Sequence, residues 1–463
     1  MKVLLVQPSV DIDFAGANEK IACLEPLHLE YLGAGIQDMC DVKILDLRLD
    51  DNLKQVLADF KPDVVGVTGF SVSGGIMKNV LREAKQTNPD IVTIAGSIFV
   101  TSYPTFFDNG PADILVIGEG VFPFQEILQK IEKKQGFSDI AGIALPQNGK
   151  MVLTQPRPFP QVDSLPFPNR SLTQKHRNDY FLPIFKPVAL LRTSVGCPFK
   201  CNFCLQHKIS GGKYFPRKPE LVLEELKTIK EPNIAFADDE TFLKTDRLMK
   251  LAQLIEEEGI KKRYHACVRA DTIVRHREVI EKWIDIGLHR VLVGFESFRE
   301  KDLSLYSKSS SVSTNEKAIH ILNDLDVDYT ADFIIRPDYG VEDFRELRAY
   351  VRKNNIQSPS FPVLTPYPGT ALFEEVKDQL LTYDFSKYDQ NHSVIPTKLP
   401  PKIFYEELSK MYEVAFPQKG IFERVKHLMT LPKGKIYEMV QDRLKYNKRR
   451  KQTKNLYKDF ENL

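Results

Sequence analysis

The strongest constraint on the fold is an alternation of short apolar runs and longer amphipathic segments, which occurs twice along the chain. In residues 1–144 the apolar runs are rich in Val and Ile, and most lead into Gly, Ser or Asp. Buried parallel strands that feed a ligand-facing loop have this composition, and the segments between them show helical spacing. We therefore predict an α/β fold that begins with a doubly wound, flavodoxin-like domain whose strand ends form a ligand crevice. Its strand candidates are KVLLVQP (2–8), DVKILDL (41–47), DVVGVTGFS (63–71), IVTIAGS (91–97) and DILVIGEG (113–120).

The second series occupies residues 188–375 and contains six strand candidates separated by helical patterns. This order predicts a partial (β/α)6 barrel with its chemistry at the C-terminal ends of the strands. Residues 145–187 carry several prolines and little periodicity, which predicts a linker across two domains. Residues 376–463 are expected to form a helical region with a basic tail. The strand candidates begin at VALLRTS (188), NIAFADD (233), RYHACVRA (263), RVLVGFES (290), YTADFIIR (329) and PSFPVLTP (359).

Composition narrows the class of protein. The chain has 64 Lys and Arg against 62 Asp and Glu, so its formal net charge of +2 produces no overall field toward nucleic acid. No run approaches the roughly 20 apolar residues that a membrane span needs, and no cleavage pattern follows the first residues. Six cysteines in 463 residues are too few for a disulfide framework. We expect a cytoplasmic protein without a nucleic-acid partner.

Three of the six cysteines form one CxxxCxxC run in TSVGCPFKCNFCLQH, residues 193–207, just after the first strand of the second series. A structural zinc site is one interpretation, but zinc there usually takes four ligands, and His207 is the only nearby candidate for the fourth. Chance clustering of core cysteines is another. A third is a four-iron cluster held by three thiolates, which leaves one iron open to a substrate or cofactor.

The phrase CPFKCNFC, with an aromatic residue before its last cysteine and a position after the first strand of a partial barrel, resembles the radical S-adenosylmethionine (SAM) superfamily. The resemblance implies a 4Fe-4S cluster held by Cys197, Cys201 and Cys204. It also implies that the open iron binds SAM, whose cleavage gives a 5′-deoxyadenosyl radical.

The same resemblance implies a SAM site formed by Phe203 and by residues at the following strand ends. Asp239 and Glu240 in AFADDETF fall where the methionyl end of SAM is bound, and Arg269 and Glu296 fall where its carboxylate and ribose are bound. Each pair has a structural alternative. The two acids could cap a helix and lie in its first turn, and Arg269 could form a buried ion pair with Glu296.

The first domain resembles the cobalamin-binding module of cobalamin-dependent radical SAM enzymes, although a doubly wound module with another ligand or none is the alternative. The matching stretches are GFSVSGG (69–75), AGSIFVTSYP (95–104) and VIGEGVFPFQEIL (116–128). The DxHxxG signature that supplies an axial histidine in related modules is absent, so we expect no histidine ligand to cobalt from this domain. The implied cobalamin-binding residues are Ser71, Ser73, Gly96, Thr101, Gly118, Glu119 and Gly120.

Together the two resemblances imply methylation of an unactivated carbon through a 5′-deoxyadenosyl radical and methylcobalamin. Longer phrases such as KIACLEPLHLEYLGAGI and VLTPYPGTALFEE resemble the hopanoid C-3 methylase branch of this family, which implies a hydrophobic, lipid-like substrate. The implied electron donor is a protein such as ferredoxin or flavodoxin. Two alternatives stay open: ring formation or carbon–carbon coupling on a tetrapyrrole, lipid or antibiotic precursor, and a non-enzymatic corrinoid or metal sensor.

Residues 422–460 combine Lys and Arg with apolar residues at helical spacing. Such a stretch can lie on an anionic membrane surface, which would make the protein peripheral to the membrane. A helical cap packed on the barrel with a solvated basic face is an equally good interpretation. RNA binding is a weaker third, because no aromatic platform accompanies the basic residues.

Overall fold

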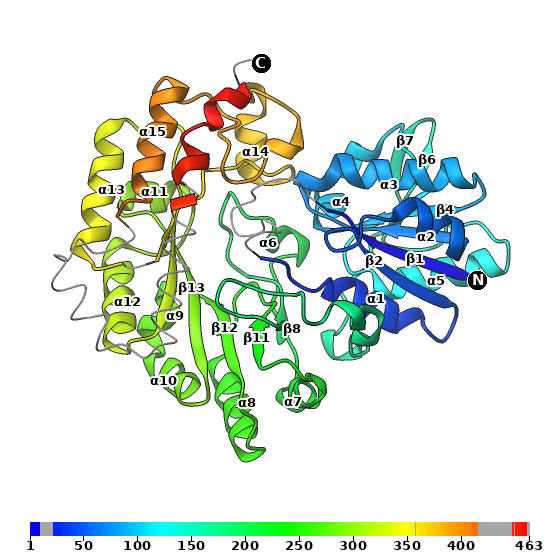
Figure 1. Cartoon of the computed structure of the whole chain (residues 1–463), viewed down its shortest axis with the longest axis horizontal. Helices are drawn as coiled ribbons and strands as arrows, with labels where there is room; N and C mark the ends of the chain where they lie inside the picture. The colour runs from blue at the N-terminus through cyan, green and yellow to red at the C-terminus, as the bar shows by residue number, and fades with distance from the viewer. Residues whose placement is uncertain (10–21, 357, 415–446, 449, 461–463) are drawn as a thin grey trace.

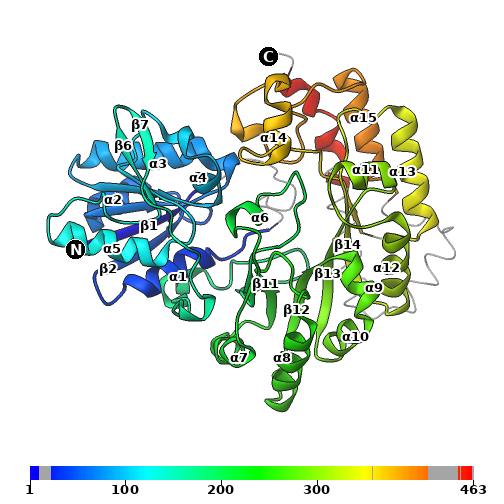
Figure 2. The same ribbon diagram turned by 180° about the vertical axis from the view of Figure 1, so that it is seen from behind.

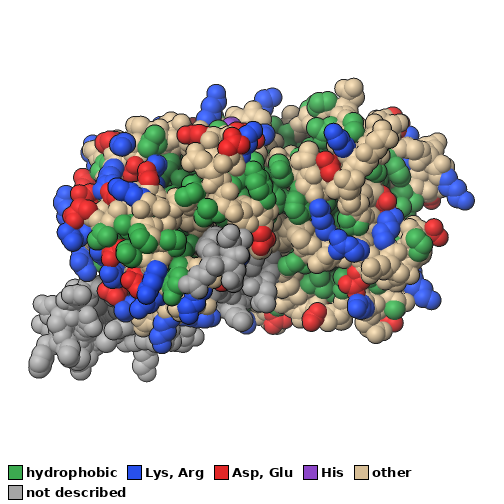
Figure 3. All heavy atoms as spheres, turned by 90° about the horizontal axis from the view of Figure 1, so that it is seen from above, with side chains coloured by type: hydrophobic (Ala, Val, Ile, Leu, Met, Phe, Trp, Pro, Cys, Tyr) green, Lys and Arg blue, Asp and Glu red, His purple; other side chains and the backbone are tan. Residues whose placement is uncertain are grey.

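The protein has two α/β units side by side, with the C-terminal segments above the second unit (Figures 1 and 2). The computed structural model describes residues 1–9, 22–356, 358–414, 447, 448 and 450–460. In a view from above, Lys and Arg side chains alternate with Asp and Glu side chains, and hydrophobic side chains lie between them (Figure 3). This mixture agrees with the nearly balanced net charge of the sequence.

The first unit is a seven-stranded sheet in the order β2-β1-β3-β4-β5-β6-β7. Its first five strands are parallel, and their order is that of a flavodoxin-like domain, as predicted. Apolar residues of α1 and α5 pack on one face of the sheet, and those of α2 and α3 pack on the other. The elements are β1 (Lys2–Gln7), α1 (Leu27–Ile36), β2 (Asp41–Asp46), α2 (Leu53–Phe60), β3 (Val64–Val67), α3 (Gly74–Thr87), β4 (Val92–Gly96), α4 (Ile98–Ser102), β5 (Ile114–Val116) and α5 (Val121–Glu132).

The sheet continues past residue 144, where the sequence placed the start of a linker. A hairpin of β6 (Ile143–Gln147) and β7 (Lys150–Leu153) pairs antiparallel with β5. Its turn is Asn148-Gly149, and both residues have positive φ, 50° and 80°. An Asn-Gly turn of this type matches the twist of two flanking strands and is a strong hairpin signal. Because prolines are frequent after the hairpin, the domain boundary predicted from the sequence lies before the end of the sheet.

The second unit is a sheet of six parallel strands in the order β15-β14-β13-β12-β11-β8, which confirms the partial barrel. Its helices cover the outer face, and their apolar residues join those of the strands in one large core. The strands are β8 (Val188–Leu191), β11 (Asn233–Phe236), β12 (Arg263–Val268), β13 (Leu288–Glu296), β14 (Asp328–Phe333) and β15 (Pro359–Ser360). The main helices are α7 (Pro219–Thr228), α8 (Thr245–Glu257), α10 (Arg277–Asp285), α12 (Val312–Asp324) and α13 (Val341–Lys353).

A buried network of charged residues joins the two units through the segment between them. The Arg177 guanidinium pairs with Glu25, which precedes α1, and its Nε donates to Glu231 Oε1 of the barrel at 2.6 Å. Arg170 donates to Glu225 Oε1 on α7 at 2.8 Å. Buried charges are tolerated only when they are paired and hydrogen-bonded. The network therefore fixes the first sheet against the barrel and determines the space between their strand ends.

The C-terminal segments contact both units. Phe385 lies edge-on to Phe99 of the first unit with ring centroids 5.5 Å apart, and α15 (Pro401–Met411) packs in the barrel core. Most of the basic stretch 422–460 lies outside the described residues. In its described end, Arg450 Nη2 pairs with Glu413 Oε1 at 2.8 Å. The interpretations of the stretch as a packed cap or as a membrane contact stay predictions. No helix in the described ranges has the length and apolar composition to cross a bilayer.

One contact of the C-terminal end predicts a pH dependence. The buried His392 ring bridges Asp389 Oδ2 at 2.9 Å and Asp459 Oδ2, near the C-terminus, at 2.8 Å. Burial opposes protonation, but the hydrogen bonds and charges of the two carboxylates outweigh it and raise the pKa of His392 above 6.5. A raised pKa in the folded state gives stability that is complete below about pH 6.5 and is lost as the pH rises through the folded value.

We therefore expect residues 450–460 to lose amide exchange protection as the pH rises above about 6.5, with protection factors corrected for the intrinsic rate. Lys387 Nζ lies 3.6 Å from Asp459 Oδ2 and forms a second ion pair with this carboxylate. His392→Asn is the control, because an amide does not titrate. A protection profile that is flat in the wild type, or equally steep in the variant, would contradict the prediction.

Candidate functional site

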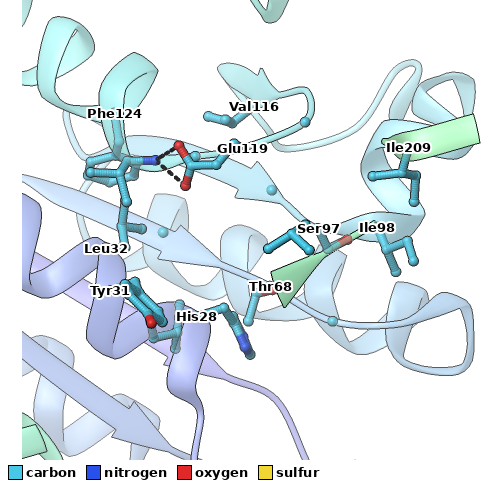
Figure 4. A pocket seen from close by; sticks show the side chains of 18 of the residues that line it. His28, Tyr31, Leu32, Thr68, Ser97, Ile98, Val116, Glu119, Phe124 and Ile209 are labelled. Atoms are coloured by element: carbon cyan, nitrogen blue, oxygen red, sulfur yellow. Dashed lines mark hydrogen bonds between the residues drawn. The ribbon is translucent and has the colours of Figure 1, made fainter. Parts of the chain in front are cut away.

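A cavity of about 380 Å³ lies between the C-terminal strand ends of the first sheet and the start of the barrel (Figure 4). Its inner part is an apolar crevice between the sheet, α1 and α5, formed by residues such as Leu32, Ile94 and Phe124. Polar groups surround its outer part, and these come from both units. They are His28, Tyr31, Thr68, Ser97, Glu119, Arg192, Ser194, Gln206 and Asp239.

Four of the predicted cobalamin-binding residues line this cavity: Gly96, Gly118, Glu119 and Gly120. Gly118 has φ +84°, and its N–H donates to Thr101 Oγ1 at 2.9 Å, so Thr101 holds the loop rather than lining the cavity. Both carboxylate oxygens of Glu119 accept from the backbone N–H of Val121, at 3.0 and 3.1 Å (Figure 4). Burial of this carboxyl raises the pKa of Glu119 above its usual value.

The two predicted serines are placed differently. Ser71 and Ser73 form a short, buried 3-10 turn after β3, and Ser73 Oγ donates to the carbonyl of Phe70 at 2.9 Å. In this loop the cavity is lined by Thr68, Gly69 and Phe70 instead. The two serines therefore stabilise the loop without lining the cavity, and Thr68, Gly69 and Phe70 face the cavity.

Two glycines leave parts of the cavity free of side chains. Gly66 on β3 lies in the crevice, and a Cβ there would approach Leu5 Cδ2 to 3.0 Å and Phe124 to 3.5 Å. The absence of a side chain at Gly66 thus keeps the crevice open. At the rim, a Cβ on Gly118 would meet nothing within 4 Å. Glycine loops allow close approach of a ligand to the backbone, and most of a bound cofactor's surface is buried in such concave sites.

The three clustered cysteines lie on the loop between β9 (Ser194–Val195) and α6 (Gln206–Ile209), beside this cavity. All three are free thiols, and Cys201 is the most buried, with 7% of its surface exposed. Burial raises the pKa of all three thiols, that of Cys204 to about 12, whereas the charge of Lys308 lowers that of Cys201. Metal binding must therefore displace their protons.

The donor set favours a multi-iron cluster over a single zinc ion. Within the described ranges, no group of three or more His, Cys, Asp or Glu side chains is arranged to hold one metal ion. A tetrahedral zinc site needs its ligands to converge on one point. In a four-iron cluster the thiolates bind separate iron atoms, and three of them on one loop fit this requirement.

Three consecutive acids follow β11 beside the cysteine loop. Asp239 lines the cavity and accepts from the N–H of Gly196 at 2.9 Å, while burial raises its pKa to about 6. Glu240 is only 2% exposed, and burial raises its pKa to about 8 against the charges of Arg269 and Lys308. Neither acid caps a helix, because α8 begins at Thr245 with Lys244 as its N-cap. The capping alternative for these two acids is therefore wrong.

Arg269 and Glu296 do not pair with each other in the described part of the chain. Arg269 Nε donates to Asp271 Oδ1 at 2.8 Å, and its guanidinium lies 3.6 Å from the ring centre of Phe199 on the cysteine loop. Lys308 Nζ donates to Glu296 Oε1 at 2.8 Å. Both predicted residues thus lie near the cysteines, each held by its own partner.

Phe203 points elsewhere, because it packs edge-on against Tyr306 with ring centroids 5.6 Å apart. It belongs to a small apolar cluster with Ile334, Leu364 and Leu372. The cavity between the two units does not include it. Its predicted contact with SAM stays a prediction.

Sequence reasoning missed three charged or titratable residues. Lys308 is a single basic residue in a serine-rich loop after α11 (Glu300–Leu305), and no motif in the sequence marks it. Arg192 directly follows β8, lines the cavity and lies 4.8 Å from the ring centre of Tyr31. His28 projects from α1 into the cavity (Figure 4). Desolvation by the surrounding walls and the charges of Arg192 and Arg48 lower the pKa of His28.

Two family models match the chain. The model of the B12 binding domain matches residues 22–128, which run from the start of α1 to α5. The model of the Radical SAM superfamily matches residues 191–351, from the end of β8 into α13. The cavity lies between the two matched ranges and is lined by both.

Similar proteins align with most of the chain. Hopanoid C-3 methylase of Methylococcus capsulatus is 29% identical over 427 residues, covering 90% of this chain and 80% of its own. Anaerobic magnesium-protoporphyrin IX monomethyl ester cyclase of Rubrivivax gelatinosus is 26% identical and covers 84% and 72%. The structure of the cobalamin-dependent S-adenosylmethionine radical enzyme OxsB, with aqua-cobalamin and S-adenosylmethionine bound, shares the fold with a TM-score of 0.73 and 16% identity, covering 99% and 72%.

Proposed function

We propose that this chain, which belongs to the cobalamin-dependent radical SAM methyltransferase family, transfers a methyl group to an unactivated carbon of a hydrophobic small molecule. The cofactors of the chain are a 4Fe-4S cluster, SAM and cobalamin. One observation supports the proposal above the others. A single cavity is bounded by the glycine loops of the B12 domain and by barrel residues next to the cysteine loop. The methyl donor and the radical source therefore face a common space.

The residues of the chain have separate tasks in this scheme. Cys197, Cys201 and Cys204 hold the cluster, and the loops at Gly96 and Gly118 receive the cobalamin. When bound, cobalamin supplies the methyl group, and the cluster with SAM supplies the radical that removes a hydrogen atom from the substrate. The apolar walls of the cavity limit access of water, which protects reactive species from side reactions.

The charged residues beside the cysteine loop suit the binding of an amino acid moiety. Arg269 presents a fixed guanidinium there, and a guanidinium binds a carboxylate with two parallel hydrogen bonds. Glu240 and Asp239 offer carboxyl groups that can accept from an amino group. Burial strengthens each of these interactions because the local dielectric is low.

The similarity to hopanoid C-3 methylase favours a lipid-like substrate. A second candidate function is cyclisation or carbon–carbon coupling, and the 26% identity to a tetrapyrrole cyclase favours it. Both candidates use the same cofactors and begin with the same hydrogen abstraction. They differ in whether the product gains a methyl group.

The test is anaerobic reconstitution with iron, sulfide and hydroxocobalamin, followed by incubation with a reductant, SAM that carries a deuterated methyl group, and a panel of lipids that begins with hopanoids. We expect formation of 5′-deoxyadenosine together with a lipid product that contains the intact deuterated methyl group. A product that loses hydrogen without gaining the label would identify a cyclase. A cofactor-loaded protein that forms no 5′-deoxyadenosine with any substrate or alone would contradict both functions.

A further inference from the structure

The end of the barrel that carries the cysteine loop also carries exposed lysines. Residues 180–219, which include this loop, contain no Asp or Glu. Lys200 lies between the first two cysteines of the run and is exposed. Lys208 is also exposed, and its Nζ donates to the Gly369 carbonyl at 3.0 Å. A third exposed lysine, Lys301, belongs to α11. Basic side chains grouped in this way attract an acidic partner.

One asparagine joins the cysteine loop to two neighbouring elements. Asn202 directly follows the second cysteine of the run, and its N–H donates to the Tyr306 carbonyl at 3.1 Å. Its Nδ2 donates to the Leu305 carbonyl at 2.9 Å. Its own carbonyl accepts from the N–H of Leu372 on α14 (Ala371–Val376) at 3.0 Å. The loop, α11 and α14 therefore meet at one end of the barrel (Figures 1 and 2). The Asn202 face is the surface formed there by Lys200, Asn202, Lys208, Lys301 and Leu305.

The Asn202 face has the composition of a small protein contact. Leu305 is 46% exposed, and Lys301 precedes it by four residues, so both side chains project from one side of α11. An apolar group with charges around it is typical of protein interfaces, and electron-transfer contacts are at the small end of their size range. None of the five residues of the face lines the cavity between the two units. A protein can therefore dock here while the cavity holds cobalamin.

The acids beside the Asn202 face are compensated or lie further away along the chain. The Glu300 carboxylate accepts from the first N–H of α12 at 2.8 Å, where the N-terminus of the helix offsets its charge. Glu374 on α14 pairs with Lys377 at 3.0 Å. The exposed acids Glu375 and Asp378 follow later than the turn of α14 that contacts the cysteine loop. The charges at the loop itself are therefore those of the lysines.

We propose that the Asn202 face is the docking site of an acidic one-electron carrier protein, which reduces the cluster held by the three cysteines beside it. Each cleavage of SAM consumes one electron from the cluster, so the cluster must be reduced again from outside. The carrier loses one electron, the cluster gains one, and no bond forms or breaks. Because Asn202 follows a cluster ligand in the chain, a carrier on this face comes close to the cluster. Opposite charges steer such an encounter and raise its rate at low salt.

The test measures reduction of the cluster by the hydroquinone of a flavodoxin, an acidic carrier, under anaerobic conditions. The protein is the full chain reconstituted with iron and sulfide, without SAM, and stopped-flow absorbance follows the flavin semiquinone that forms. For the wild type we expect the rate constant to fall at least about tenfold as the ionic strength rises, because salt screens the lysines. Photoreduced 5-deazariboflavin, a small neutral reductant, measures reduction of the cluster without docking.

Two charge reversals locate the docking site. Lys301→Glu and Lys200→Glu should each slow reduction by flavodoxin at least about fivefold at low salt, with a weaker salt dependence. Iron content and reduction by 5-deazariboflavin should stay as in the wild type. Lys301→Glu decides the question, because Lys301 lies outside the cysteine loop. Lys261→Glu is the matched control, since it changes an exposed lysine between α8 and β12, at the opposite end of the barrel.

Three results would overturn the proposal. The first is an equal rate with flavodoxin in Lys301→Glu, Lys261→Glu and the wild type, and the second is a wild-type rate that does not depend on salt. The third is slower reduction of Lys301→Glu by both reductants, because the charge would then act on the cluster and not on docking. The inference rests on the cluster and not on methyl transfer. These rates, recorded without SAM or substrate, therefore test it separately from the proposed function.

Discussion

Replacement of Cys201 by alanine is expected to abolish the 4Fe-4S cluster and all formation of 5′-deoxyadenosine. Cys201 is the most buried of the three loop cysteines; burial raises its pKa, and the charge of Lys308 opposes this shift. With three protein ligands, loss of one leaves two irons without a thiolate, and oxygen ligands are poor substitutes for sulfur. The measurements are the iron and sulfide content, the visible absorbance of the reconstituted protein, and 5′-deoxyadenosine detected by mass spectrometry.

The control for this variant is Cys40→Ala. Cys40 is half-buried at the end of α1, where its Sγ donates to the Ile36 carbonyl at 3.3 Å, and it lies outside the cavity lining. This control should keep its iron and its activity. Cobalamin binding should survive in Cys201→Ala, because the first sheet has its own apolar cores. A Cys201→Ala protein that retains a full cluster would contradict the ligand assignment, and loss of cobalamin as well would show that the two units depend on each other.

Most of the fold follows from local patterns in the sequence. Central strands of the first sheet, such as β3 and β4, are short Val- and Ile-rich runs buried on both faces, and this composition is typical of parallel strands. In the barrel, β12 and β14 alternate buried and half-buried residues instead. The hairpin of β6 and β7 was not predicted, because Pro146 and Gln147 interrupt the apolar pattern expected of a strand. Only its Asn148-Gly149 turn marks it in the sequence.

The candidate site likewise contains residues that the sequence predicts and residues that only the structure reveals. The cysteine run and the acids after β11 are recognisable because their spacing in the chain reflects one loop and one strand end. Lys308, Arg192 and His28 are single residues from distant segments, and only the folded chain brings them near the cavity or the cysteine loop. No pattern over a few residues encodes such contacts. For the loop at residues 68–73, the motif predicts where the loop lies. It does not predict which residues of the loop face the cavity.

Replacement of Gly120 by tryptophan is expected to abolish tight cobalamin binding while the protein stays folded. Gly120 lines the cavity and is the N-cap of α5 with φ −96° and ψ −22°, which any residue can adopt. A Cβ there would meet only Val116 Cγ1, at 3.9 Å, so the indole would occupy space in the cavity without straining the backbone. Overfilling an occupied site excludes its ligand. The corrin absorbance that remains after gel filtration, and the dissociation constant from titration, measure the effect.

Gly136→Trp serves as the comparison for Gly120→Trp, because it adds the same indole to an exposed position where a Cβ would meet nothing within 4 Å. We expect this comparison protein to bind cobalamin like the wild type, and we expect both variants to keep the wild-type iron content after reconstitution. The indole of Gly120→Trp fills the cavity and should weaken cobalamin binding by at least about 100-fold. The cluster should stay in place, because the cysteine loop belongs to the barrel. Equal cobalamin affinity in Gly120→Trp and wild type would mean that the cofactor binds outside this cavity. In that case the methyl donor and the radical source would not share a common space, because it is the loops at Gly96, Gly118 and Gly120 that line the cavity opposite the barrel.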